Sequence, residues 1–407
     1  MAITFHKETL SNGLTIIAEV DPDAHSAAAG FFVRTGARDE STPLMGVSHF
    51  LEHMMFKGSD ALSAEAINQA FDDLGASNNA YTSNEMTCFY AHVLPEAFDP
   101  VLDLLGQLMR PALRQDDFDT EKGVILEEIA MYADNPFWVL YEACIDRFYT
   151  PHPLAHRVLG TPETITDLTR DQMLKYFTER YAADNTTVAL AGRVDFAKAV
   201  ANIQARCEPW ENTDARRDLS PVKTNEQILT LHDERVTRAY MLGVSKAPAV
   251  NDPRRYAATL AAQVLGAADN SRLHWALIEP GLADETQAAY TGHEGIGEFF
   301  IYASCHPDQS DKVWEIILNE CAQLRDSIEE DDLAKLRAKL VTGVTLSSER
   351  PLDRMMRLGK LWTLLHDYIT LEDELSAINK VTLGDIKDLL DTFPITPQVQ
   401  GRLMPGQ

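Results

Sequence analysis

Two histidines, His49 and His53, lie four positions apart in the segment HFLEHMMFKGS, with Glu52 directly before the second. In a helix, side chains at positions i and i+4 lie on one face, so both imidazoles could bind the same metal ion. Imidazole is a common zinc ligand, and a neighbouring carboxylate can take a proton from a water activated by the metal. The pattern therefore indicates metal-assisted hydrolysis. The alternative is an ordinary amphipathic helix in which the histidines have no shared role.

A catalytic zinc site usually has three protein ligands, so a third must come from elsewhere in the chain. The segment FDTEKGVILEEIAMYADNP, residues 118–136, has the spacing of a helix with an apolar side. Glu121 and Glu128 are seven positions apart and therefore lie on one face of it, two turns apart, whereas Glu127 points elsewhere. From spacing alone, these carboxylates could reach the first helix or could form a solvent-exposed acidic face.

Five segments, in this order along the first half of the chain, resemble the successive motifs of the pitrilysin and insulinase-type zinc peptidases. They are HFLEHMMFKGS at 49–59, NNAYTSNEMTCFYAHVLP at 78–95, EKGVILEEIAMYADNP at 121–136, HPLAHRVLGTPETI at 152–165 and YAADNTTVALAGRVD at 181–195. The closest likeness is to the short-chain branch that includes the mitochondrial processing peptidase and its bacterial relatives. Five motifs in order are far more specific than the inverted HxxEH motif by itself.

The resemblance implies a role for each matching residue. The zinc ligands would be His49, His53 and Glu128. Glu52 would be the general base, and Glu121 would be the second acidic residue, which supports the site without holding the metal. The implied activity is that of a zinc metalloendopeptidase with Zn²⁺ as its cofactor.

The resemblance also implies where a peptide substrate binds. Asn79 and Ala80, in NAYTS, match the segment that lies along the bound peptide. An extended peptide is expected to pair with an exposed sheet edge next to the metal. Tyr81 and Thr82 follow in the same strand, and we interpret them as ordinary strand residues, because aromatic and β-branched side chains favour strands.

One motif of the family is altered in this chain. In the family, an Arg and Tyr pair from the domain without zinc stabilises the oxyanion, and the corresponding stretch here is SRLHWALIEPGLADETQAAY, residues 271–290. Ile278 and Asp284 stand opposite that pair, and Arg272 and Tyr290 do not fall on the motif. We therefore expect a homologous partner subunit, in a heterodimer, to supply the pair, and a homodimer is the alternative.

A second function stays open beside the peptidase. Some relatives have become non-catalytic peptide-binding or assembly subunits of a related complex, and loss of metal ligands would mark such a change. None of the three implied ligands, His49, His53 and Glu128, is lost here. The sequence therefore favours the peptidase.

Composition narrows the possible partners. The 407 residues include 36 basic and 62 acidic side chains, for a formal net charge of −26, and this charge argues against binding to nucleic acid. The five cysteines are scattered without a CxxC motif, which is typical of reduced thiols. No stretch approaches the ~18 apolar residues of a membrane span, and the start lacks the pattern of a signal peptide. We therefore expect a cytoplasmic protein that does not associate with membranes.

The elements that must position these residues alternate between strands and helices. KETL and LTIIAEV flank the turn sequence Ser-Asn-Gly and predict a hairpin. SAAAGFFVRTGARDES follows, and it predicts a strand that ends in a turn before the helix bearing HxxEH. Strands and helices then continue to alternate through the first half of the chain. This order predicts the α+β class.

The second half repeats the first. LTRDQMLKYF at 168–177 resembles VTLGDIKDLL at 381–390, and VTRAYMLGVSKAP at 236–248 is the counterpart of the strand before the zinc helix. When Gly58 is aligned with Gly266, the HxxEH residues fall on alanine and leucine. The second half is therefore expected to be a structural copy without a metal site.

These observations predict two structurally similar domains, each a mostly antiparallel sheet with helices packed on one face, arranged as a clamshell. The polar, charged stretch ENTDARRDLSPVKTNEQ marks the boundary. We place the zinc-bearing domain at residues 1–215, a linker at 216–226 and the homologous domain without zinc at 227–407. A clamshell would enclose a cavity that admits extended peptides and excludes folded proteins.

Overall fold

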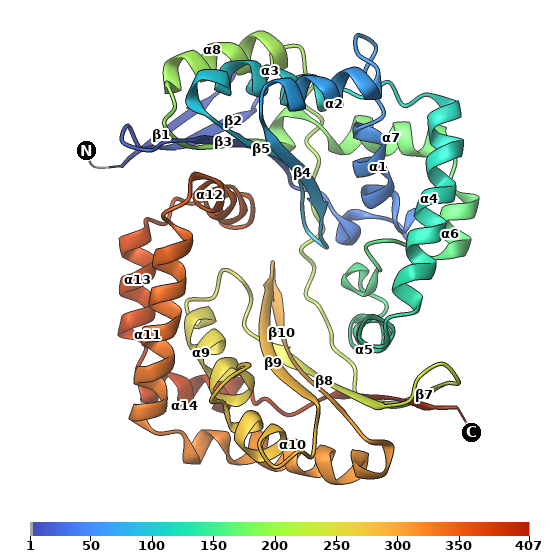
Figure 1. Cartoon of the computed structure of the whole chain (residues 1–407), viewed down its shortest axis with the longest axis vertical. Coiled ribbons are helices and arrows are strands. Elements are labelled where there is room, and N and C mark those ends of the chain that lie inside the picture. The colour runs from blue at the N-terminus through green and yellow to red at the C-terminus, as the bar shows by residue number, and fades with distance from the viewer. Residues whose placement is uncertain (1–2, 407) are drawn as a thin grey trace. The chain divides into compact units, whose positions relative to one another are not determined.

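The computed structural model describes residues 3–406 and divides into two compact units (Figure 1). Unit 1 comprises the chain up to Ile129, residues 156–218 and residues 345–369. Unit 2 comprises residues 130–155, residues 219–344 and the chain from Thr370 onward. Each unit is therefore assembled from both halves of the sequence.

The sheet of unit 1 has six strands in the order β1-β2-β6-β3-β5-β4. Their bounds are Thr4–Thr9 (β1), Thr15–Val20 (β2), Thr186–Gly192 (β6), Ala27–Val33 (β3), Thr87–Val93 (β5) and Ser77–Thr82 (β4). β2 and β6 run parallel, and the other neighbouring pairs are antiparallel. β4 lies at one edge of this sheet.

Helices cover both faces of this sheet. Those encoded in the first half of the chain are α1 (Val47–Met55), α2 (Ala64–Asp73), α3 (Phe98–Leu108), α4 (Gln115–Ala133), α6 (Pro162–Asp167), α7 (Arg170–Arg180) and α8 (Phe196–Cys207). Short 3₁₀ helices accompany them: η1 (Ala37–Asp39) and η2 (Thr42–Leu44) before α1, and η3 (Pro95–Ala97) and η5 (Ala183–Asn185) later in the chain. The helix α12 (Pro351–Leu365), from the second half, contacts β2, β3 and β6. Figure 1 shows α12 on the face opposite α3 and α8.

The sequence of β3 explains why two layers are needed. All seven residues of AAAGFFV are buried, as in a strand that is covered on both faces. Ala29 and Phe31 belong to the main core of unit 1. Phe32 points the other way, and its ring would lie only 2.1 Å from a Cβ placed on Gly359 of α12. The glycine therefore lets α12 pack closely against the second face.

The sheet of unit 2 has five strands in the order β7-β11-β8-β10-β9. Their bounds are Gln227–Asp233 (β7), Val399–Pro405 (β11), Ala239–Ala247 (β8), Ile296–Cys305 (β10) and Glu285–His293 (β9). β7 and β11 run parallel, and the other pairs are antiparallel. This order, with its one parallel pair, repeats β2-β6-β3-β5-β4 of unit 1.

The helices of unit 2 also cover both faces. They are α5 (Pro136–Tyr149), α9 (Arg255–Gly266), α10 (Ser310–Ser327), α11 (Glu330–Ser347), α13 (Leu371–Lys380) and α14 (Leu383–Thr392), with the short helices η4 (Pro153–Ala155), η6 (His274–Ile278) and η7 (Pro307–Gln309). Met241 of β8 packs in the core with α9, whereas Leu242 and Val244 pack with Leu140 and Cys144 of α5. α5 comes from the first half of the chain, so the two halves exchange one helix each.

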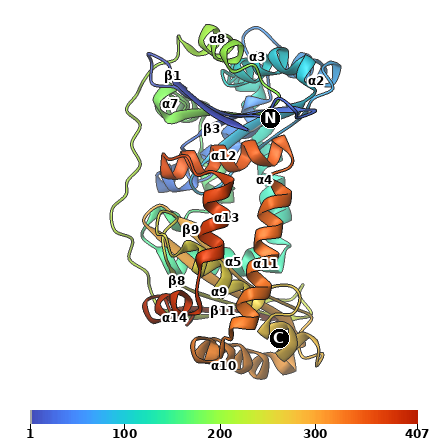
Figure 2. The ribbon, with the colours of Figure 1, turned by 90° about the vertical axis from the view of Figure 1, so that its left-hand side faces the viewer.

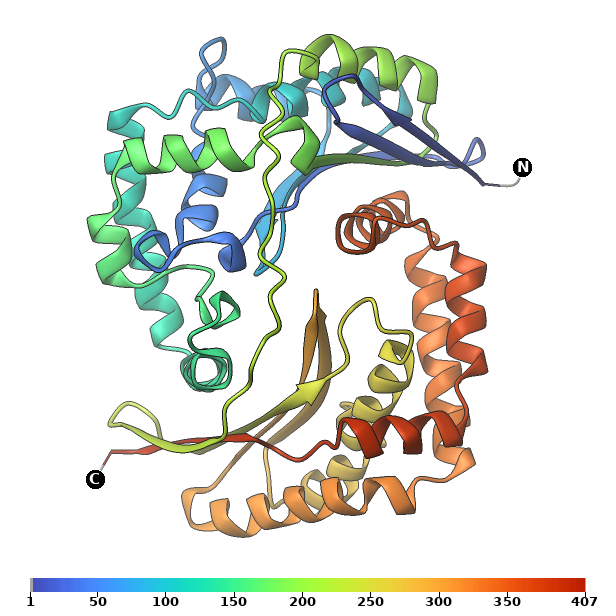
Figure 3. The ribbon, with the colours of Figure 1, turned by 180° about the vertical axis from the view of Figure 1, so that it is seen from behind.

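The predicted α+β class with two similar, mostly antiparallel units is confirmed, and the structure adds the exchanged helix on the second face of each sheet. The segment 211–226 contains no helix or strand and joins α8 to β7, as Figures 2 and 3 show. The predicted linker, 216–226, lies within it. The domain limits 1–215 and 227–407 stay predictions about the two halves of the sequence, because each compact unit takes one helix from the other half. Among the described residues, no helix has the length and apolar character needed to cross a bilayer.

Candidate metal and catalytic site

The helix α1 carries both histidines of the HxxEH motif, and Glu40 fixes the start of this helix. The carboxylate of Glu40 accepts hydrogen bonds from the backbone N–H groups of Gly46 at 2.7 Å and Ser48 at 2.8 Å. These are N–H groups at the helix start that have no partner inside the helix. Glu40 is buried, so this cap holds the turn that leads into His49 and His53.

The three implied ligands converge in unit 1. The Nε2 atoms of His49 and His53 lie 3.7 Å and 3.6 Å from one carboxylate oxygen of Glu128, which α4 supplies. One ligand atom from each of the three residues lies within 4.8 Å of the others, and among the described residues this is the group that could hold a metal. Two ligand atoms each about 2.1 Å from a tetrahedral zinc ion lie roughly 3.4 Å apart. The distances of 3.7 Å and 3.6 Å between the imidazole nitrogens and the Glu128 oxygen are close to this value.

The protonation of His49 also fits a metal better than an ion pair. Burial and, to a smaller extent, the neighbouring His53 together lower the pKa of His49 to about 4, so the imidazole is neutral at physiological pH. A neutral ring forms no ion pair with Glu128, and 3.7 Å is too long for a hydrogen bond. The three donors therefore surround a position suited to a cation.

Glu121 holds His53 from the side opposite Glu128. His53 donates from Nδ1 to Glu121 over 2.9 Å, because a carboxylate can only accept, and this leaves Nε2 free as a ligand atom. Lys57 lies 2.5 Å from the other oxygen of Glu121. Burial raises the pKa of Glu121, but the hydrogen bonds from His53 and Lys57 outweigh burial and lower it. Lys57 was missed from the sequence, although it lies four residues after His53, one helical turn away.

Glu52 lies on α1 next to the ligands and is held by Thr82 of β4. The Thr82 hydroxyl donates to one oxygen of Glu52 over 2.6 Å. Burial raises the pKa of Glu52, and the hydrogen bond from Thr82 acts in the opposite direction. The interpretation of Thr82 as an ordinary strand residue was therefore incomplete. Its signal in the sequence was its place two residues after Ala80, on the same face of the strand.

Asn79 and Ala80 lie on β4, at the sheet edge beside the metal position. They are opposite Tyr90 and Phe89 of β5, and among the described residues β4 pairs with β5 alone. An edge strand presents N–H and C=O groups that an added strand can pair with. The structure thus places both residues where an extended peptide could add to the sheet.

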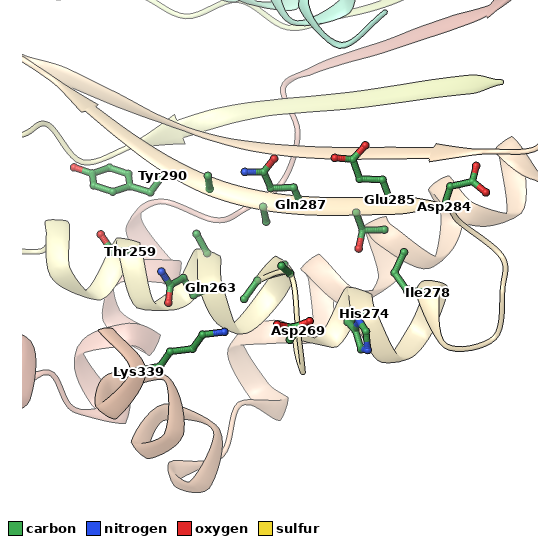
Figure 4. A pocket seen from close by; sticks show the side chains of 17 residues that line it. Thr259, Gln263, Asp269, His274, Ile278, Asp284, Glu285, Gln287, Tyr290 and Lys339 are labelled. Carbon is green, nitrogen blue, oxygen red and sulfur yellow. The ribbon is translucent and has the colours of Figure 1, made fainter. Parts of the chain in front are cut away.

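The stretch where the family's Arg and Tyr are expected lies in unit 2, around a cavity of about 720 Å³ between α9 and β9. Ile278 lines it, and Asp284 also lines it while paired with Arg238. Figure 4 shows Tyr290 at the end of the cavity opposite Ile278 and Asp284. The Tyr290 hydroxyl donates to the backbone oxygen of Pro248 over 3.0 Å, so it is already engaged.

Comparison with known protein families places both halves of the chain in one group. Residues 15–162 match the model of the insulinase family, peptidase family M16. Residues 167–340 match the model of the peptidase M16 inactive domain.

Curated relatives cover nearly the whole chain. An uncharacterized zinc protease from Streptomyces coelicolor is 31% identical over 401 residues, which span 94% of this chain and 86% of that protein. An uncharacterized zinc protease from Bacillus subtilis is also 31% identical, over 94% of this chain and 93% of that protein. The solved structure of a protease from Helicobacter pylori has a TM-score of 0.93 at 20% identity, and the match covers 99% of this chain and 100% of that one. At this identity the solved structure supports the fold alone.

Proposed function

The chain belongs to the insulinase family, peptidase family M16, and from this premise we propose that it is a zinc-dependent metallopeptidase that hydrolyses extended peptides. The observation that carries the proposal is the convergence of His49, His53 and Glu128, with Glu52 beside them on the same helix. Relatives named as zinc proteases support zinc as the metal. Neutral imidazoles and a carboxylate are also a ligand set that zinc favours.

The residues of the chain divide the chemistry between them. Bound Zn²⁺ would polarise the peptide carbonyl and lower the pKa of water. Glu52 accepts the proton of the attacking water and then delivers it to the leaving amine. Thr82 holds one oxygen of Glu52, which leaves the other oxygen for the proton. Glu121 and Lys57 keep the imidazole of His53 oriented.

The substrate would bind as an additional strand. Its backbone would pair with β4 at Asn79 and Ala80, which brings the bond to be cleaved beside Glu52. Pairing through the backbone requires an extended peptide and sets little demand on side chains. The clamshell and its enclosed chamber remain predictions that agree with this choice of substrate.

We propose a homologous partner subunit as part of the active enzyme. Ile278 is apolar and Asp284 is an acid paired with Arg238, so neither provides a donor for an oxyanion. Arg272 donates to the Ser327 hydroxyl over 2.7 Å, so it is already engaged as well. A heterodimer in which the partner supplies an Arg and a Tyr would complete the site, and a homodimer is the alternative.

The same altered motif favours the second candidate, a non-catalytic peptide-binding or assembly subunit. Solved structures with a similar fold include one described as a protease and one described as an inactive domain. One similar structure is titled as the peptidase M16 inactive domain from Pseudomonas fluorescens, with a TM-score of 0.92 at 19% identity, over 100% of this chain and 98% of that one. The retained ligand set, His49, His53 and Glu128, makes the peptidase the better supported candidate.

Metal analysis and one substitution test the proposal. The purified chain is expected to contain close to one zinc ion, and Glu52→Gln is expected to keep it, because both imidazoles stay in place. Hydrolysis of an unstructured fluorogenic peptide should fall by about 10²- to 10⁴-fold in this variant, as for loss of a general base.

Two results would count against the assignment. Turnover near wild type in Glu52→Gln, with zinc retained, would remove Glu52 from the role of base. A chain that binds no zinc and cleaves no peptide, with or without its partner, would favour the non-catalytic subunit.

A further inference from the structure

The long connection at 211–226, one of the places where the chain passes between the units, contains one buried residue, Arg217. The segment 211–226 has no helix or strand, and Arg217 alone among its residues is buried, with 1% of its side chain exposed. Its neighbour Arg216 has the same charge, but 82% of its side chain is exposed. A buried arginine in an otherwise exposed stretch must be compensated by partners, because an unpaired buried charge is costly.

The partners of Arg217 lie in η1 and in the β4–β5 turn of unit 1. Its guanidinium donates to both oxygens of Asp39, at 3.0 Å and 2.7 Å, and to the backbone oxygen of Glu85. Arg38 donates to the Glu85 carboxylate over 2.7 Å. The side chains of all four residues are at most 5% exposed. Two arginines and two carboxylates thus form a buried network, and Arg180 at its margin lies 3.9 Å from Asp39.

Two arginines also hold the backbone on either side of Arg217. Arg180 donates to the backbone oxygen of Arg216 over 3.0 Å, and Arg38 donates to that of Asp218 over 3.3 Å. Three successive residues of the connection are therefore fastened to unit 1 at the point where the chain leaves it.

One attachment point of Arg217 is the β4–β5 turn, which directly follows the strand residue that contacts the proposed base. Glu85 lies in the turn between β4 and β5, directly after Ser83 and Asn84. The backbone N–H of Arg38 donates to the Asn84 oxygen over 2.8 Å, which ties the same turn to η1. Thr82, the last residue of β4, donates to Glu52. Only two residues, Ser83 and Asn84, separate the anchored Glu85 from Thr82, whose hydroxyl holds the proposed base.

We propose that Arg217 is a positioning residue of the site: it anchors the connection between the units on the β4–β5 turn and thereby keeps Thr82 on Glu52. The inference rests on the proposed peptidase function. Without the guanidinium, Asp39 and Glu85 lose a partner and leave excess negative charge in the network. The turn then loosens, and the oxygen of Thr82 leaves the position from which it donates to Glu52.

Hydrogen exchange tests whether Arg217 anchors the β4–β5 turn, and this measurement does not require an active enzyme. In Arg217→Gln, the amide of Arg38, which bonds to the turn, and that of Ser83 should exchange faster than in wild type. Amides of β3 should be unchanged. Arg216→Gln is the matched control, since it removes the same charge from the neighbouring, exposed position. Equal exchange of the turn in the two variants would overturn the proposal.

A double-mutant cycle tests whether Arg217 acts through Thr82. Arg217→Gln and Thr82→Val should each lower kcat by about 10- to 100-fold, as for a small misplacement of catalytic groups, while KM and zinc content stay unchanged. Because both would break one contact, Arg217→Gln should cost little more in the Thr82→Val background. Additive losses, or a rise in KM alone, would refute the link to Glu52.

Two further variants distinguish a loss of positioning from a folding defect. Arg217→Lys keeps the charge but loses the bidentate hydrogen bond to Asp39, so an intermediate loss of kcat is expected. Asp39→Asn combined with Arg217→Gln removes the carboxylate that has lost its closest ion-pair partner, and it should restore stability but not kcat. Recovery of kcat with stability would assign Arg217 a structural role only. A wild type that is inactive both alone and with its partner subunit would reject the proposed function, whereas the exchange experiment would still decide whether Arg217 anchors the turn.

Discussion

Two glutamates of α4 contact the two nitrogens of one imidazole and so take different roles. Glu128 lies 3.6 Å from Nε2 of His53, beyond hydrogen-bond distance, whereas Glu121 accepts from Nδ1 at 2.9 Å. Glu127 is adjacent to Glu128 in sequence but is exposed to solvent. The division of roles follows from the helical period, because residues seven apart share a face and adjacent residues do not.

Substitution of these three glutamates should separate their roles. Glu128→Gln is expected to weaken zinc binding most, since it removes a ligand charge. Glu121→Gln should cost about 10- to 100-fold in zinc affinity, as for other groups that orient a ligand, and Glu127→Gln should have little effect. Competition with a chromophoric chelator measures all three. Equal losses in Glu127→Gln and Glu128→Gln would mean that the ligand assignment is off by one residue.

The sequence predicted the residues that share one helix face and missed those whose partners come from distant segments. His49 and His53 could be paired from their spacing, and the family resemblance joined them to Glu128. Thr82 gave only the weak signal of sharing a strand face with Ala80, and Arg217 gave none. Their hydroxyl and guanidinium reach Glu52 and Asp39 only after a strand and a loop have been brought together, and helical or strand periodicity does not encode such contacts.

At the scale of elements, the exchanged helices α5 and α12 were not predicted. Apolar periodicity shows that a helix has a face to bury, but it does not show which sheet will receive it. The continuous apolar run AAAGFFV of β3 did carry part of the answer, because it is typical of a strand covered on both faces. What the run could not provide was the origin of the second layer, more than 300 residues away in α12.

Substitution of Gly359 tests how tightly α12 packs on β3, and substitution of Gly343 on α11 is the control. Gly359→Ala puts a methyl group where the Phe32 ring lies, 2.1 Å from the new Cβ, and overpacking of this kind costs about 1–3 kcal/mol. Gly343→Ala on α11 has nothing within 4 Å of the new Cβ and should stabilise by up to about 1 kcal/mol through helix propensity. Urea denaturation measures both. Unchanged stability of Gly359→Ala would mean that α12 adjusts its position freely.

At the scale of the whole molecule, activity is expected to depend on a second chain. The chain alone lacks an oxyanion donor at Ile278 and Asp284, and one such donor is typically worth about 10²- to 10³-fold in rate. Adding a homologous subunit that carries the Arg and Tyr should therefore raise peptidase activity by at least that factor. The assay compares the purified chain alone, the partner alone and the mixture.

Full activity of the isolated chain would reject the heterodimer. Tyr290→Phe would then show whether Tyr290 leaves its hydrogen bond to Pro248 and serves as the donor. A loss of kcat in this variant would identify it, and unchanged kcat would leave the metal as the main source of stabilisation.

The exchange of α5 and α12 has a consequence for how this gene can be divided. The long connection at 211–226 looks like a natural place to split a duplicated protein. A cut there would leave the first half with a helix whose sheet is absent and with β3 uncovered on the side of Phe32, and the second half would have the reciprocal defect around Leu242. Truncation to one repeat would therefore expose two apolar surfaces at once, so neither repeat is expected to fold by itself.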